Sequence, residues 1–135
     1  MVVRVSAKLS YRGRSVETSL LLNSGYEAPG PRVLLPKALA EELGITEGRS
    51  ITVRTSIGEG VVLDAGVSIE VEVEGRTASA LVRISEAETE AIANDALVEE
   101  LGIIILKPKT GTYRFTDDPY DMERESVEPT FWTGG

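Results

Sequence analysis

One nine-residue unit occurs twice in the chain and limits how it can fold. Lys37 to Ile45 reads KALAEELGI and Asp95 to Ile103 reads DALVEELGI, so seven of nine positions are identical. Each copy predicts a short amphipathic helix that stops at a glycine. A duplicated unit indicates internal quasi-symmetry, in which each helix packs its leucines on the core. The alternative is a chance match, since Ala, Leu and Glu are all good helix formers.

Most of the remaining sequence has the two-residue period of β-strands. Val2 to Tyr11 and Ser15 to Leu22 predict a hairpin closed by a short polar turn at Arg12–Gly13–Arg14. Further strands are predicted at Val33 to Leu35, at four runs between Ser50 and Ile84 (SITVRTS, GVVL, VSIEVEVEG and TASALVRI), at Ile103 to Leu106 and at Thr112 to Phe115. We therefore expect a mainly β fold with two short helices.

Two segments interrupt this pattern. Glu27 to Pro31 (EAPGP) must be a loop, because two prolines and a glycine break both helices and strands. Leu63 to Gly66 (LDAG) predicts a bulge or bend between two strands.

The C-terminal segment differs from the rest of the chain. Thr116 to Gly135 is acidic, contains prolines and has no period, which predicts a single domain over residues 1–115 and a partly disordered acidic extension over residues 116–135. Phe131 and Trp132 could anchor this extension on the domain or on a partner.

Composition excludes several function classes. The chain has no cysteine and no histidine, which argues against disulfides, zinc sites and Ser-His or Cys-His catalysis, and we expect neither a metal nor a cofactor. A net charge of −8 argues against nucleic acid as a partner. No signal peptide or membrane span is recognisable, so a cytoplasmic protein without membrane contact is expected. The absence of glutamine and the abundance of Glu, Arg and Val hint at a thermophilic source.

The apolar strand that ends at Leu22 runs directly into Asn23–Ser24–Gly25. Were the asparagine an aspartate, this turn would present a carboxylate, a bracing hydroxyl and a glycine that lets a substrate backbone come close. Two such turns across a two-fold axis form a dyad that shares one proton and activates water. If the halves are duplicates, an echo of the turn is expected near Leu81–Val82–Arg83, fourteen residues before Asp95, and none is found. Chemistry that needs two turns would therefore need two chains.

Three stretches together carry a family resemblance: SLLLNSGYEAPGPRVLLPKALAEELGI, TSIGEGVVL and AIANDALVEELGIIILKPKTG. The region from Val2 to Phe115 resembles the single-domain, retropepsin-like aspartic proteases of archaea and bacteria. The resemblance implies a closed-sheet, acid-protease-type barrel with two short helices, a homodimer, and peptides or unfolded proteins as substrates.

The resemblance also implies residue roles. Asn23 stands at the catalytic aspartate position, Ser24 at the residue that braces the two active-site loops, and Gly25 beside the substrate backbone. The tip of a flap that closes over the peptide matches Ile57, Gly58, Glu59 and Gly60. Tyr26 joins these as a substrate-binding position, and Ile92 and Ala93 match an apolar residue and a glycine packed behind the active-site loop.

Asn23 predicts that the chain is catalytically dead or nearly so, because a carboxamide can neither take a proton from water at neutral pH nor share one. An engineered replacement and a natural pseudoenzyme both account for it. An ordinary Asx turn after a strand is the simpler explanation of Asn-Ser-Gly taken alone.

Two competing functions stay open. Arg32 to Thr55 also resembles the swapped-hairpin DNA-binding regulators, although the acidity of the chain, its second helix copy and its length argue against them. The other is a catalytically silent dimeric module that binds peptides or proteins. It becomes the leading hypothesis if Asn23 is natural.

Overall fold

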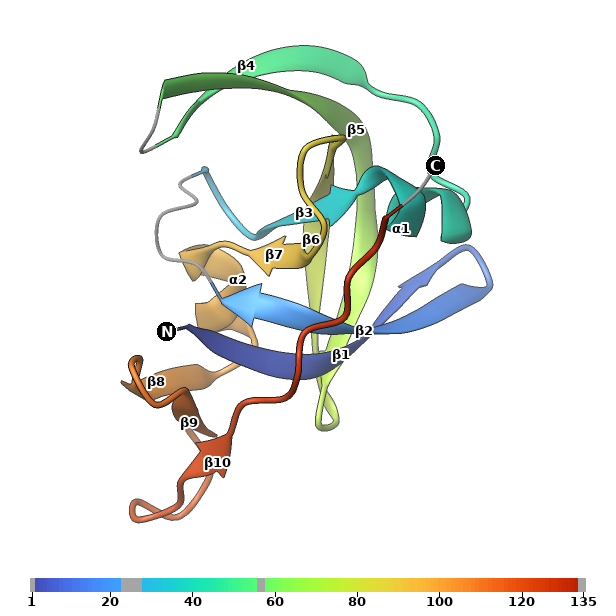
Figure 1. Cartoon of the computed structure of the whole chain (residues 1–135). Coiled ribbons are helices and arrows are strands. Elements are labelled where there is room, and N and C mark those ends of the chain that lie inside the picture. The colour runs from blue at the N-terminus through green and yellow to red at the C-terminus, as the bar shows by residue number, and fades with distance from the viewer. Residues whose placement is uncertain (1, 23–27, 56–57, 134–135) are drawn as a thin grey trace.

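The computed structural model describes residues 2–22, 28–55 and 58–133, and Figure 1 shows their arrangement. These residues form mainly strands, with two short helices. The elements in chain order are β1 (Val3–Tyr11), β2 (Arg14–Leu22), β3 (Arg32–Pro36), α1 (Lys37–Glu42), β4 (Arg49–Thr55), β5 (Gly58–Val73), β6 (Arg76–Ser85), β7 (Ala91–Ala93), α2 (Asp95–Glu100), β8 (Ile103–Lys107), β9 (Thr112–Phe115) and β10 (Arg124–Glu125).

Six of the strands close into a barrel. Their order is β1-β2-β7-β3-β6-β5, and a further antiparallel pairing of β5 with β1 completes the ring. The interior holds apolar side chains from the strands and both helices, among them the fully buried Leu9, Leu20, Leu39 and Leu97. The closed sheet with two short helices, expected from the resemblance, is confirmed as the architecture of the described residues.

The register shows that the repeat extends beyond the two helices. The β1–β2 and β5–β6 hairpins have equivalent turns, in which Gly13 and Gly75 adopt φ values of 82° and 80°. These glycines are 62 positions apart, and so are Leu9 and Val71, which lie opposite each other where β1 meets β5. β2 pairs in parallel with β7 just as β6 pairs in parallel with β3. The barrel is therefore two copies of one hairpin–strand–helix unit, as the repeated helix predicted.

This symmetry corrects the expected place of the second turn. β2 and β6 correspond at a spacing of 62 residues, so the counterpart of Asn23 is Ser85 and not a residue of Leu81–Arg83. The helices are only 58 positions apart, because the connection before the second helix is four residues shorter. The Ser85 hydroxyl accepts hydrogen bonds from the N–H groups of Ala87 (3.1 Å) and Glu88 (3.3 Å). A serine thus stands where a second carboxylate would be needed.

Both helices begin after a residue that suits a helix start, and both stop at the glycine that the sequence predicts. Pro36, with φ of −57°, precedes α1, and the side chain of Asn94 caps α2. Beyond each helix a glycine takes the left-handed conformation, with φ of 81° at Gly44 and 71° at Gly102. This conformation suits glycine because it has no side chain to clash with the backbone.

The strands differ from prediction in three respects. GVVL and VSIEVEVEG are parts of one long strand, β5, and the predicted bend is an irregularity in its register between Asp64 and Ser68. β7 was not predicted, because three residues between an acidic loop and a helix are too few to show a period. β10, only two residues long, was missed for the same reason.

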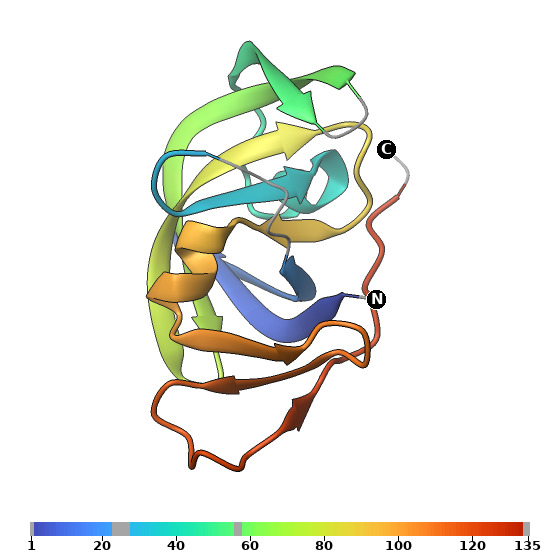
Figure 2. The same ribbon diagram turned by 90° about the vertical axis from the view of Figure 1, so that its left-hand side faces the viewer.

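The second sheet, β10-β9-β8, lies against one end of the barrel (Figure 2). Phe115 is fully buried there and lies close to two guanidinium groups, with Cζ of Arg76 3.7 Å and Cζ of Arg124 5.1 Å from its ring centroid. Asp118 accepts two hydrogen bonds from Arg124, at 2.8 and 2.9 Å, and lies 3.8 Å from Arg76. This cluster fastens the small sheet to the turn between β5 and β6.

The C-terminal segment runs along the outside of the barrel across β1 and β2 (Figure 1). Val127 N–H donates to the carbonyl of Arg4 at 3.0 Å, and Thr130 N–H donates to the hydroxyl of Ser19 at 2.7 Å. Trp132 is the last anchor, and its contacts are with the barrel of its own chain. Where the sequence suggested partial disorder, the described part of this segment, residues 116–133, is held by specific hydrogen bonds.

Candidate functional site

The residues predicted for the site divide into two groups. Asn23, Ser24, Gly25, Tyr26 and Ile57 lie outside the described residues. The structure places the others on two elements: Gly58, Glu59 and Gly60 begin β5, and Ile92 and Ala93 belong to β7.

The strand that leads to Asn23 is fixed by its neighbours in the barrel. Leu22, the last residue of β2, is buried and lies opposite Ala93, while Leu21 lies opposite Ile92. Ala93 is fully buried and also faces Val33 of β3. Ile92 and Ala93 therefore lie directly beside the strand end that precedes the predicted turn.

Asn94 ties the loop after the turn to helix α2. Its Oδ1 accepts hydrogen bonds of 3.0 Å from the N–H groups of both Arg32 and Leu97, and its Nδ2 donates to the carbonyl of Gly30 at 2.9 Å. The side chain is almost fully buried, with 1% exposure. The repeated unit predicts a helix from Asp95 onward and gives no sign of this second role of Asn94. An asparagine just before a helix is a frequent N-cap, which was the available signal.

The hairpin formed by β4 and the first part of β5, residues 49–64, is the second part of the site, and we call it the hairpin arm. β4 pairs with β5 from Arg49 opposite Asp64 to Thr55 opposite Gly58. In Figure 1 the arm curves over β3, β6 and β7. A Cβ added at Gly58 or Gly60 would meet no atom of the described residues within 4 Å, so these residues leave room for a Cβ at both glycines.

The base of the hairpin arm is built around two glycines. A Cβ at Gly48 would lie 2.9 Å from the carbonyl oxygen of Asp64, so only glycine fits between the strands here. On the other strand, Gly66 has φ of 69° and donates its N–H to Oδ1 of Asp64 at 3.0 Å. Asp64 thus stabilises the bend from which the arm departs, in agreement with the predicted bend.

The described groups whose pKa values are clearly shifted lie in other parts of the molecule. Hydrogen bonds from Arg124 and from the N–H of Phe115 hold the pKa of Asp118 well below its usual value of 3.8. A bidentate pair with Glu90, at 2.6 and 3.1 Å, raises the pKa of Arg4. Burial raises the pKa of Tyr113. These shifts reflect structural ion pairs and burial.

Within residues 2–22, 28–55 and 58–133, no group of three or more acidic side chains is arranged to hold a metal ion. No helix in the same part of the chain is long and apolar enough to cross a membrane.

The chain was also compared with known proteins. It matches none of the protein-family models and none of the curated proteins with which it was compared.

Proposed function

We propose that this chain is one protomer of a homodimeric, retropepsin-like aspartic endopeptidase in which Asn23 replaces the catalytic aspartate. One observation carries the proposal: Leu22, the buried last residue of β2 before Asn23, lies opposite Ala93, and the hairpin arm curves over the adjoining strands β3, β6 and β7 (Figure 1). A protease of this kind needs a rigidly held turn after this strand and a hairpin that closes over the peptide.

The chemistry explains why the chain as it stands should bind peptides without cutting them. In the active form, two aspartates share one proton; one takes a proton from the attacking water while the other polarises the peptide carbonyl. The amide of Asn23 offers neither a basic oxygen nor a shared proton. In a symmetric dimer both members of the dyad are lost at once.

The homodimer is part of the proposal because each chain supplies a single turn of this kind. The counterpart of Asn23 within the chain is Ser85, whose hydroxyl accepts hydrogen bonds from the backbone N–H groups of Ala87 and Glu88. A second copy related by a two-fold axis, the commonest symmetry of soluble oligomers, would supply the missing turn. Light scattering at micromolar concentration should give the mass of a dimer, and a monomer would remove this part of the proposal.

A non-catalytic peptide- or protein-binding module is the second candidate, favoured by the asparagine itself. The swapped-hairpin DNA-binding regulators rank below it. β3 pairs within the chain with β6 and β7, and β4 pairs with β5, so the strands of that motif already have partners. The net charge of −8 adds repulsion from nucleic acid.

Restoring the carboxylate tests the proposed function. The Asn23→Asp variant should cleave peptides that the chain as it stands only binds. A binding module would gain no cleavage from this substitution.

A further inference from the structure

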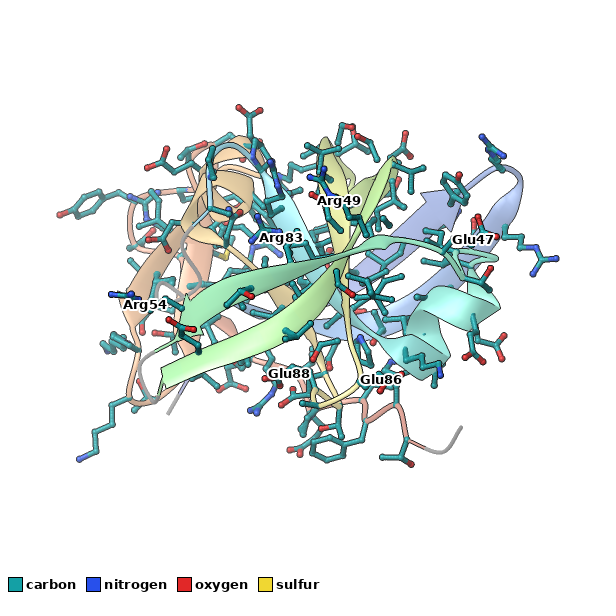
Figure 3. The ribbon with its side chains drawn as sticks, turned by 90° about the horizontal axis from the view of Figure 1, so that it is seen from above. Glu47, Arg49, Arg54, Arg83, Glu86 and Glu88 are labelled. Carbon is teal, nitrogen blue, oxygen red and sulfur yellow. The ribbon has the colours of Figure 1, made fainter. Side chains whose placement is uncertain are left out.

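A surface cavity lies where the C-terminal segment meets helix α1 and the loop between β6 and β7. Its volume is about 370 Å³. Three parts of the chain line it: the start of α1 with Lys37 and Ala38, the loop with Glu86, Glu88 and Thr89, and the C-terminal segment with Trp132 and Thr133. Figure 3 shows Glu86 and Glu88 on one side of the hairpin arm and Arg49 on the other. The proposed function gives this cavity no role.

Hydrogen bonds hold two parts of the cavity wall in place. The indole N–H of Trp132 donates to the hydroxyl of Thr18 at 2.9 Å, and its backbone N–H donates to the carbonyl of Thr89 at 2.7 Å. In the loop between β6 and β7, the hydroxyl of Ser85 accepts the N–H of Glu88 at 3.3 Å. A wall that is ordered before a ligand arrives lowers the entropic cost of binding.

Trp132 offers a ligand the face of an aromatic ring. Its one polar side-chain atom, Nε1, is already engaged with Thr18, and the half-buried ring packs against the core. The part of the ring that remains accessible is therefore apolar carbon. The face of an aromatic ring carries partial negative charge, and among aromatic side chains tryptophan binds cations best. This wall favours a cation over an anion.

The charged residues of the cavity also favour a cation. Lys37 pairs with Glu86 at 3.3 Å, and because both side chains are exposed this ion pair is weak. Within residues 2–22, 28–55 and 58–133, no lysine or arginine nitrogen lies within 4 Å of the Glu88 carboxylate. Among these residues, Glu88 therefore has no counter-ion, and it lines the same cavity as the tryptophan.

An arginine side chain meets both requirements of this cavity. Its planar guanidinium stacks on an aromatic ring and binds a carboxylate through two parallel N–H···O bonds. Its alkyl stem covers apolar surface, which Ala38 and the indole of Trp132 provide. A Ca²⁺ or Mg²⁺ ion fits less well, because each needs several oxygen ligands and gains nothing from an apolar wall.

We propose that this cavity binds the arginine side chain of a peptide, with the guanidinium over the indole of Trp132 and paired with Glu88. The net charge of −8 draws a basic peptide toward the chain. The inference goes beyond the proposed function and does not depend on it, since it needs neither Asn23, nor a second chain, nor a closing arm.

The chain has a single tryptophan, which allows a direct test with the protein as it stands. The tripeptide acetyl-Gly-Arg-Gly-amide, which contains no aromatic residue, is titrated while tryptophan fluorescence is followed. Binding should change the fluorescence saturably, with a Kd on the order of 1 mM, as expected for a few exposed contacts. The same peptide with citrulline, an uncharged isostere of arginine, should bind about tenfold more weakly. Added salt should weaken binding of the arginine peptide.

Matched variants locate the contact. Glu88→Gln should weaken binding of the arginine peptide about two- to fivefold, because the ion pair is lost. Lys37→Met should strengthen binding, since a competing cation is removed. Glu99→Gln is the control, because Glu99 is exposed on α2 and does not line the cavity. Two-dimensional NMR should show that the peptide shifts the indole N–H signal of Trp132 and leaves the amide signal of Glu99 unchanged. Circular dichroism verifies that each variant is folded.

The absence of a saturable response would overturn the inference, and so would equal binding of the arginine and citrulline peptides. An effect of Glu99→Gln as large as that of Glu88→Gln would also overturn it, as would an indole signal of Trp132 that the peptide leaves unchanged. None of these results bears on cleavage by the Asn23→Asp variant, so failure of this inference and failure of the proposed function are distinguishable.

Discussion

The indole N–H of Trp132 donates a hydrogen bond of 2.9 Å to the hydroxyl of Thr18, a residue of β2 that lies 114 positions earlier in the chain. The backbone N–H of Trp132 donates at the same time to the carbonyl of Thr89, at 2.7 Å. Thr89 lies in the loop before β7, so Trp132 joins β2 to the loop that leads into the neighbouring strand of the barrel. The C-terminal segment is thereby part of the folded unit.

The first prediction concerns this anchor. Trp132→Ala removes the hydrogen bond to Thr18 and the packing of a half-buried indole, so the free energy of unfolding should fall by about 1–3 kcal/mol. The neighbouring Phe131, which is 60% exposed, provides the control, and Phe131→Ala should change stability by less than about 0.5 kcal/mol. Urea unfolding measures both. Equal effects would mean that the indole does not anchor the segment.

A second prediction concerns Asn94. Asn94→Ala removes the helix cap and, with it, the almost fully buried amide that binds the Gly30 carbonyl and the Arg32 N–H, which should cost about 2–4 kcal/mol. Asn94→Ser retains a cap oxygen for Leu97 and should cost less. Thermal unfolding of the two variants tests this order, and a tolerated alanine would contradict it.

The third prediction follows from the depressed pKa of Asp118. A carboxyl whose pKa is lower in the folded state stabilises the protein above its unfolded pKa, and this stabilisation disappears as pH falls through the folded pKa. The Asp118→Asn variant should therefore be less stable than the parent at neutral pH, by an amount that stays constant down to mildly acidic pH. The difference should begin to shrink as pH falls past the usual value of 3.8 and should disappear only well below it. Denaturation curves at several pH values measure it, and a difference that vanishes near neutral pH would contradict the assignment.

The fourth prediction concerns the motion of the hairpin arm. Among the described residues, its tip pairs with one strand and a Cβ added at Gly58 or Gly60 would meet nothing within 4 Å, so the amides of residues 58–60 should exchange faster with solvent than those of any other described strand. The amide of Leu9, in the closed barrel, serves as the reference. Hydrogen-exchange mass spectrometry can compare the two. Equal protection would argue against an arm that opens and closes.

Much of the fold was predictable because its signals are local. The β1–β2 turn at Gly13, the helix stops at Gly44 and Gly102, and the bend at Asp64 all follow from residues close together in the sequence. The repeated helix was also enough to predict quasi-symmetry.

The parts that escaped prediction depend on contacts between distant segments. The pairing of Leu22 with Ala93 sets the register that makes Ser85 the counterpart of Asn23. Counting fourteen residues back from the second helix missed this position, because the connection before that helix is four residues shorter than the one before the first helix. Asn94 acts on a loop 62 positions earlier, at Arg32.

The central claim is that the turn at Asn23 is a disabled aspartic-protease site, and a peptidase assay of Asn23→Asp tests it most directly. General acid–base help contributes about 10²–10⁴-fold to rate, so the parent chain should show no measurable hydrolysis. Asn23→Asp should cleave peptides or unfolded protein, fastest at acidic pH, where one carboxylate of the pair keeps its proton. Asp64→Asn in that background should change cleavage of an uncharged peptide little, since Asp64 stabilises a bend. An Asn23→Asp protein that is folded and dimeric but inert toward a broad peptide library from about pH 3 to about pH 7 would contradict the account.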